Sequence, residues 1–292
     1  MKRIRNIPKS TALIFIFSVA LSLNTASMAV AKSEPIIDAH VHLDFEQKQD
    51  QISGIPYTKA EFMKETAEAG VTGFVAHTSS DEMPIPDMDG LTPTFCVGVH
   101  EEVKLSVVEA GLKSGKYKCI KIYLGYAYKY PYDESYKPLY KLAEQMNVPV
   151  VFHTGDTSTK DAKVKYSHPL AIDEVAVDFP RTTFVIAHVG NPWFRSAAEV
   201  AYKNDNVYVD ASGIMIGDLT KYKNEDFKKY IIEPVSWVFG YIDNSKKMMF
   251  GTDWPLVNIK QYLNIVQRAI PPADRRAFLH DNAVRVFHIQ EK

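Results

Sequence analysis

Two histidines separated by a single residue, His40 and His42, lie in the apolar stretch IIDAHVHLD at residues 36–44. If this stretch is a β-strand, both imidazoles point to the same face, because side chains alternate with a period of two. Two imidazoles about 7 Å apart on one strand face can bind one metal ion if that face looks into a closed pocket. Without such a pocket, the pattern also fits an apolar strand that carries two incidental histidines.

Three more residues of the metal-ligating type close apolar runs later in the chain. His153 lies in VPVVFHT (148–154), His188 in TFVIAHV (183–189) and Asp253 in KMMFGTD (247–253), and loop-forming residues follow each run. Any one of them could be a core or capping residue. Buried together without a metal ion, however, they would carry a severe desolvation cost.

The elements that must position these residues alternate regularly along the chain. Strands are expected at 36–44, 71–78, 94–100, 119–123, 148–154, 183–189, 206–210 and 247–253. Helices are expected at 58–69, 101–116, 136–146, 168–178, 192–202, 227–242, 261–269 and 273–287.

Most of the expected strands are nearly continuous apolar runs, which indicates strands that are buried on both faces of a parallel sheet. Eight β/α units in roughly 260 residues predict a single-domain (β/α)8 TIM barrel. A doubly wound open sheet is the alternative, but no Gly-x-Gly-x-x-Gly follows the first strand. In a barrel, chemistry gathers at the C-terminal ends of the strands, where the candidate ligands lie.

The first 31 residues have the pattern of a cleaved secretory signal peptide. A basic head is followed by the uncharged apolar run 12–23 and by Ala29-Val30-Ala31, which resembles a signal-peptidase site. We expect cleavage after Ala31, a mature domain at 32–292, and a periplasmic or secreted protein. The apolar run is too short to span a bilayer comfortably, so no membrane association is expected after cleavage.

Charge and cysteine content exclude several other classes of protein. The mature chain would be mildly acidic and has no basic run, so nothing predicts binding to nucleic acid or to an anionic membrane. Cys96 and Cys119 each lie in an apolar, strand-like segment. An oxidising compartment would permit a disulfide, but two buried free thiols are the favoured interpretation.

Five segments together resemble the amidohydrolase-related branch of the metal-dependent amidohydrolase superfamily: IIDAHVHLD, FPRTTFVIAHVGNPW, NVYVDASG, MMFGTDWP and DNAVRVF. This branch includes aminocarboxymuconate-semialdehyde decarboxylase and several lactone hydrolases. The resemblance runs from about residue 36 to residue 287. It implies a divalent metal, usually one zinc ion, bound by His40, His42, His153 and Asp253. It also implies that His188 lies beside the ion as a general base, an electrophilic helper or a further ligand.

The resemblance implies an enzyme that acts on a small-molecule substrate, and we favour a hydrolase of an ester, lactone or amide. We hypothesise that the ion lowers the pKa of a bound water toward ~7, that Asp253 or His188 removes its proton, and that hydroxide attacks the carbonyl. A non-oxidative decarboxylase shares the same motifs and is the alternative. For such a substrate, Arg195 or the lysines at 160, 163 and 165 could anchor a carboxylate. A non-catalytic binding barrel is a third possibility, but all five ligand positions are filled.

Three residues beside the strand ends are predicted to contact the substrate: Lys121, Tyr123 and Trp254. Lys121 could instead be the carbamylated lysine that bridges two ions in binuclear members of the superfamily. We favour an unmodified ammonium, since the amidohydrolase-related branch is mostly mononuclear. Tyrosines crowd residues 123–136 and could stack on an apolar or aromatic substrate, or form an interface in a homodimer.

The remaining polar residues receive secondary roles. His77 and His100 also stand at strand ends and could line the pocket, while Asp210 and Ser212 could orient a metal-bound histidine. Asp38 is expected to make a structural hydrogen bond. The histidines expected on the surface or in packing are His168, His280 and His288.

Overall fold

Eight parallel β-strands form one sheet whose spatial order, β1 to β8, follows the sequence. The strands are β1 (Ile36–Val41), β2 (Val71–His77), β3 (Thr92–Val99), β4 (Cys119–Ile122), β5 (Val150–Phe152), β6 (Phe184–Ile186), β7 (Val207–Asp210) and β8 (Met248–Met249). The computed structural model describes residues 34–80 and 85–290. The predicted signal peptide at 1–31 therefore lies outside the described residues.

The sheet closes on itself through backbone hydrogen bonds between β1 and the segment that follows β8. Ala39 donates to the carbonyl of Phe250 over 2.9 Å, and His42 donates to that of Trp254 over 2.8 Å. In the opposite direction, Asp253 donates to the carbonyl of His40 over 2.8 Å. The predicted (β/α)8 TIM barrel is thus confirmed, and its closure brings the first and last candidate ligands together.

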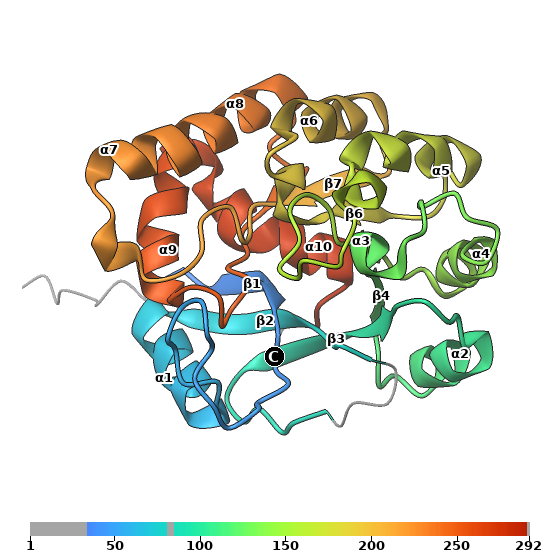
Figure 1. Ribbon diagram of the computed structural model, residues 1–292, viewed down its shortest axis with the longest axis horizontal. Coiled ribbons are helices and arrows are strands. Elements are labelled where there is room, and N and C mark those ends of the chain that lie inside the picture. Colours follow the sequence, from blue (N-terminus) through green and yellow to red (C-terminus); the bar gives the residue numbers. More distant parts are fainter. Residues whose placement is uncertain (1–33, 81–84, 291–292) are drawn as a thin grey trace, which may run out of the picture. The chain divides into compact units, whose positions relative to one another are not determined.

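Helices surround the strands (Figure 1). The α-helices are α1 (Lys59–Ala69), α2 (Leu105–Lys113), α3 (Leu124–Ala127), α4 (Lys137–Met146), α5 (Ile172–Asp178), α6 (Phe194–Lys203), α7 (Asn224–Phe227), α8 (Glu233–Ile242), α9 (Ile259–Val266) and α10 (Asn282–Phe287). Two π-helical segments, at Lys228–Ile232 and Ala277–Asp281, precede α8 and α10. Among the described residues, no helix is long and apolar enough to cross a membrane.

Local sequence explains where α1 begins and ends. The Thr58 side chain accepts a hydrogen bond from the amide of Glu61 over 3.2 Å and thereby caps the helix. Gly70 ends it with a left-handed φ of 76°. Pro234 does not break the helix around it. The backbone stays helical from α7 through a π-helical segment into α8, and Pro234 stands in the first turn of α8, just after the π-helical segment.

The inside of the barrel holds an apolar layer beneath the polar strand ends. Val75, Cys119 and Val151 belong to one buried cluster and stand two residues before His77, Lys121 and His153. Because side chains alternate along a strand, each apolar residue shares a face with the polar residue that follows it. The larger cluster packs the outer faces of the strands against the helices, with members such as Phe152, Phe184 and Leu139.

Cys96 and Cys119 form a disulfide bond, so the expectation of two free thiols is wrong. The two residues are direct partners in the register of β3 and β4, and their Cα atoms lie 4.3 Å apart. Both are fully buried. The register of neighbouring strands decided the pairing, and the sequence alone does not reveal that register.

Candidate metal centre and active-site cavity

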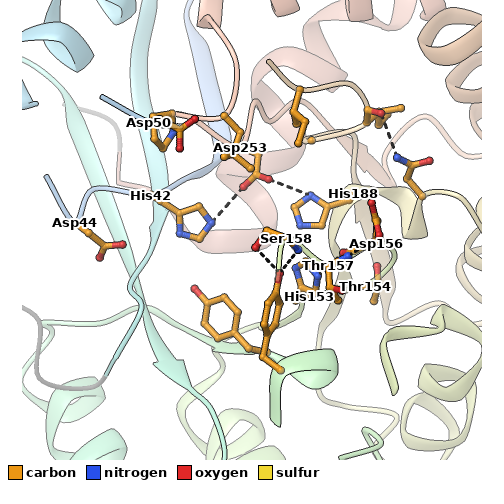
Figure 2. A pocket seen from close by; sticks show the side chains of 18 of the residues that line it. His42, Asp44, Asp50, His153, Thr154, Asp156, Thr157, Ser158, His188 and Asp253 are labelled. Atoms are coloured by element: carbon orange, nitrogen blue, oxygen red, sulfur yellow. Dashed lines mark hydrogen bonds and ion pairs between the residues drawn. The ribbon is translucent and has the colours of Figure 1, made fainter. Parts of the chain in front are cut away.

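A cavity of about 420 Å³ opens at the C-terminal ends of the strands. His42, His153, His188 and Asp253 line it together with residues from the loops that follow β1, β5, β7 and β8 (Figure 2). This is the end of a parallel barrel where catalytic residues are found.

His40, His188 and Asp253 form the tightest group of possible ligands. One ligand atom from each lies within 4.8 Å of the other two, and all three residues are buried. His188 and Asp253 have left-handed backbone conformations, with φ of 60° and 68°. Residues other than glycine adopt this region at an energetic cost, and such residues cluster at functional sites.

His42 joins this group, whereas His153 stands beside it. His42 Nδ1 donates to the carbonyl of His77 over 2.9 Å, which leaves Nε2 as the free nitrogen, 3.2 Å from Asp253 Oδ1. The ring of His153 lies 5.1 Å from that of His188, but its Nε2 donates to the carbonyl of Asp156 over 2.9 Å. As a ligand, His153 would offer Nδ1 or release this hydrogen bond, so its role as a ligand stays a prediction.

Asp210, at the end of β7, orients two of the histidines. Its Oδ2 accepts a hydrogen bond from His40 Nδ1 over 3.0 Å. Its Oδ1 accepts from the backbone amide of His188 over 3.1 Å and from the hydroxyl of Ser212. Ser212 Oγ in turn lies 2.9 Å from His188 Nδ1. Asp210 and Ser212 thus occupy the orienting positions predicted for them, and they direct Nε2 of His40 toward the centre.

Asp38 holds β1 against the segment that carries Asp253. Its carboxylate accepts from the Thr252 hydroxyl over 2.6 Å and from the Thr252 amide over 3.0 Å. Burial raises the pKa of Asp38 to about 7, against the lowering effect of these hydrogen bonds. This is the structural hydrogen bonding expected for Asp38.

The protonation states of the group suit a divalent cation. Burial lowers the pKa of His40 and of His153 well below the usual value, so both imidazoles are neutral. Burial alone would raise the pKa of Asp253, but His188, His42 and His40 bring it well below its usual value. Metal binding requires neutral imidazoles and an ionised carboxylate. Asp253 Oδ1 is buried and has no hydrogen-bond partner among the described residues, as expected for an atom that faces a cation. The residues present therefore fit a metal ion.

Lys121 and Trp254 do not line the cavity, and their contact with the substrate stays a prediction. Lys121 is fully buried, and its Nζ donates to His40 Nε2 over 3.1 Å, a bond that a metal ion on this nitrogen would replace. Burial lowers the pKa of Lys121 to about 8. Trp254 is also fully buried, with its ring centroid 4.9 Å from that of Phe62 and 5.5 Å from that of Tyr57. Trp254 thus lies among packed aromatic rings, whereas Lys121 points from below toward the candidate metal centre.

Aromatic residues form part of the wall. Tyr123 lines the cavity, as predicted, and stacks on His100 with ring centroids 4.3 Å apart. Tyr126 also lines it, and its hydroxyl accepts from the amide of Ser158 over 2.9 Å. The other tyrosines of residues 123–136 lie elsewhere: Tyr136, for example, is in the core.

His77 does not line the cavity, a position considered for it from the sequence, whereas His100 does. His77 is fully buried beneath the cavity, with its ring 4.0 Å from that of His40, and its carbonyl holds His42. Its position at the end of β2, on the face of the other candidates, was the available signal. The cations considered as anchors for a carboxylate do not line the cavity: Arg195, for example, packs over the ring of Trp237 at 5.1 Å.

Solved structures similar to this chain share its fold at low sequence identity. An uncharacterized TIM-barrel protein from Bordetella bronchiseptica aligns with a TM-score of 0.66 and 20% identity over 87% of this chain and 98% of that chain. A probable 2-pyrone-4,6-dicarboxylic acid hydrolase from Acinetobacter baumannii has a TM-score of 0.59 and 14% identity, over 87% and 99%. A 5-carboxyvanillate decarboxylase from Novosphingobium aromaticivorans, solved with bound manganese, has a TM-score of 0.63 and 10% identity, over 89% and 98%. No curated protein matches the sequence.

A comparison with known families is more specific. The family described as "Amidohydrolase" matches residues 90–289, well over half of the chain. The match begins after β2, so the His-x-His motif of β1 is a separate observation that agrees with it. With a closed barrel, a buried group of histidines and an aspartate at its C-terminal end, and this match, the chain belongs to the amidohydrolase family of metal-dependent enzymes.

Proposed function

We propose that this protein is a metal-dependent hydrolase that acts on the carbonyl group of an ester, lactone or amide. The observation that carries the proposal is the arrangement of His40, His188 and Asp253, whose possible ligand atoms lie within 4.8 Å of one another. Asp210 orients two of these residues through hydrogen bonds. An arrangement of this kind brings a metal-binding site and proton acceptors to one point.

The residues that would hold a divalent ion are His40, His42 and Asp253, and His153 is proposed as a further ligand. We propose zinc, which imidazole and carboxylate ligands suit, and one ion per chain. Manganese, which the similar decarboxylase binds, is the metal to test beside it. When bound, such an ion supplies Lewis acidity, which polarises a carbonyl and makes water more acidic.

The protein's own residues would then move the proton and hold the substrate. The ionised Asp253 accepts a proton from the attacking water, and the neutral His188 is the second acceptor beside it. A proton taken by His188 is stabilised through Ser212 by the negative charge of Asp210. The wall formed by Tyr123 and His100 supports a flat or apolar part of the substrate.

Decarboxylation is the second candidate reaction. The structural likeness to a 5-carboxyvanillate decarboxylase and the aromatic wall with Tyr123 favour it. Against it, none of the described residues that line the cavity is a lysine or an arginine, so no permanently charged side chain of the wall would pair with the carboxylate of such a substrate. Hydrolysis of a carbonyl compound needs no such anchor and is therefore preferred.

Export from the cytoplasm, with cleavage after Ala31, is proposed together with this activity. The buried Cys96–Cys119 disulfide supports it, because disulfides persist mainly in oxidising compartments. The homodimer stays a prediction. A free N-terminus at Lys32 in protein purified from the periplasm or the medium would test the cleavage site.

Metal analysis of the purified protein, combined with a screen of lactones, esters and aromatic carboxylates, tests the proposed reaction. We expect about one ion per chain, and turnover that a chelator abolishes and zinc restores. In the double variant His40→Ala/His42→Ala, both the bound metal and the turnover should be lost. The exposed His288, changed to Asn at a left-handed position that Asn tolerates, is the matched control.

Two results would contradict the proposal. Full turnover by the metal-free double variant would exclude the metal mechanism. Release of carbon dioxide without consumption of water would select decarboxylation instead.

A further inference from the structure

The cavity wall carries three carboxylates in addition to Asp253. Asp44 and Asp50 belong to the loop after β1, and Asp156 belongs to the loop after β5. In Figure 2, Asp44 and Asp50 lie on one side of the metal-ligand group and Asp156 lies on the other. No lysine or arginine is among the described residues at this wall.

The negative charge of these carboxylates is not balanced locally. Asp44 accepts hydrogen bonds from the hydroxyls of Tyr57 and Ser79, each over 3.2 Å. Asp50 accepts from backbone amides of its own turn, and Asp156 accepts from the amide that follows it. All of these donors are uncharged. With the described residues, none of the three carboxylates makes an ion pair, unlike the surface pair of Asp173 and Lys203 at 2.7 Å.

The base of the cavity differs from this outer wall. There, the buried Asp253 Oδ1 has no hydrogen-bond partner among the described residues, and a metal ion would balance its charge. Asp44, Asp50 and Asp156 lie outside the metal-ligand group, so their charges would face the part of the substrate beyond the carbonyl. Tyr123 and Tyr126 add aromatic faces to the wall, and such faces attract cations.

We propose that the cavity selects a substrate with a positively charged group, such as an ammonium, beyond the carbonyl that is attacked, and rejects anionic analogues. The physical reason is that a cleft lined by charges of one sign concentrates ligands of the opposite sign. A single anionic group on the substrate would instead meet three uncompensated carboxylates. This inference rests on the proposed hydrolase function and adds the charge class of its substrate.

Turnover of three matched esters tests the inference. The esters share one acyl group, and their alcohol part ends in a trimethylammonium group, its uncharged tert-butyl isostere, or a sulfonate. At low ionic strength we expect kcat/KM to fall about ten-fold from the cationic to the neutral ester, and again from the neutral to the anionic ester. The differences should shrink as salt is added, because mobile ions screen exposed charges.

Variants identify the carboxylates that are responsible. Asp44→Asn and Asp156→Asn should each reduce the ratio of kcat/KM between the cationic and the anionic ester by about five-fold. Asparagine keeps the hydrogen-bond acceptor at each position and removes the charge. Asp178→Asn, at the exposed end of α5 and away from the cavity wall, should leave the ratio unchanged.

Calorimetric binding of non-hydrolysable ethers with the same three end groups to the metal-loaded protein separates the two proposals. Tightest binding of the cationic ether supports the inference, even if none of the esters is hydrolysed, a result that would contradict only the proposed reaction. If the anionic ether binds as tightly as the cationic one, the inference is overturned. Metal-dependent turnover without charge preference would also overturn it and leave the hydrolase standing.

Discussion

The inside of the barrel changes from apolar to polar within two residues along the same strands. The lower layer consists of apolar side chains and the disulfide: Val75, Cys96, Cys119 and Val151. The upper layer consists of the polar side chains His77, Lys121 and His153, each two residues further along the chain, and of Asp253, which follows β8. Both layers are held by the same backbone hydrogen bonds between strands.

The two layers differ in what completes them. The lower layer is complete without a ligand, because buried apolar side chains and a disulfide need no hydrogen-bond partners. The upper layer still contains buried polar atoms without hydrogen-bond partners among the described residues, at His77 Nδ1 and Asp253 Oδ1. The comparison indicates that the lower layer stabilises the barrel by packing. The upper layer can therefore keep polar atoms without protein partners, which a metal ion and a substrate would contact.

The largest expected effect is that of Asp253→Asn in the upper layer. The amide can neither accept the proton nor balance a metal ion, so kcat/KM should fall by about 10³-fold. Circular dichroism should show an unchanged fold, since the lower layer is untouched. Steady-state kinetics of Asp205→Asn, an exposed position before β7, provide the control. Activity above a tenth of wild type would remove Asp253 from the mechanism.

The second effect tests the lower layer. The double variant Cys96→Ala/Cys119→Ala releases a loop closed over a sequence separation of 23 residues, and the free energy of unfolding should fall by about 3 kcal/mol. Urea unfolding, with reduced and oxidised wild type as references, measures this loss. Turnover at 25 °C should persist, because the disulfide lies below the site. An unchanged urea midpoint would show that the disulfide does not stabilise the barrel.

Asp210→Asn should have an intermediate effect, because it acts through the residues that it orients. His40 and His188 would lose their common anionic partner, and metal affinity should drop by about 10- to 100-fold. Titration with metal should then restore part of the activity, which a direct catalytic role would not allow. Asp205→Asn serves again as the control, and metal affinity equal to wild type would contradict the orienting role.

The substitution Tyr126→Phe should have the smallest effect. Tyr126 lines the cavity above the upper layer. The change removes the hydroxyl that accepts from the amide of Ser158 at the cavity wall. Without this bond, ordering the loop on substrate binding should cost about 1 kcal/mol more, so we expect KM to increase about five-fold. Tyr202→Phe, at an exposed position on α6, is the matched control. An unchanged KM would show that this loop does not contact the substrate.

Local patterns in the sequence were sufficient to predict most of the fold and the main part of the candidate site. Continuous apolar runs predicted eight parallel strands, and their ends placed His40, His188 and Asp253 at one mouth. The strand bounds differ by a few residues: β8 covers only Met248–Met249, because the chain leaves the ladder before Asp253. Periodicity reports which face a residue occupies, and this was enough to predict where the ligands meet.

Features that depend on neighbours from distant segments could not be predicted in this way. The Cys96–Cys119 bond requires the register of β3 against β4. The burial of Trp254 depends on aromatic residues of α1 and the β1 loop, which pack around it. Lys121 lies on the strand face that points into the barrel, as periodicity predicts. How far below the cavity it lies depends on the tilt and stagger of the strands.

The closure of the barrel has a consequence for the order in which the protein matures. Asp38 and Thr252, which join its two edges, are separated by 214 positions, so this contact forms only after nearly the whole polypeptide has been synthesised. A nascent chain that stops short of residue 253 lacks the carboxylate that is proposed as a metal ligand, so the proposed metal site is incomplete. The proposed site can therefore be completed only when the segment after the last strand docks against the first strand.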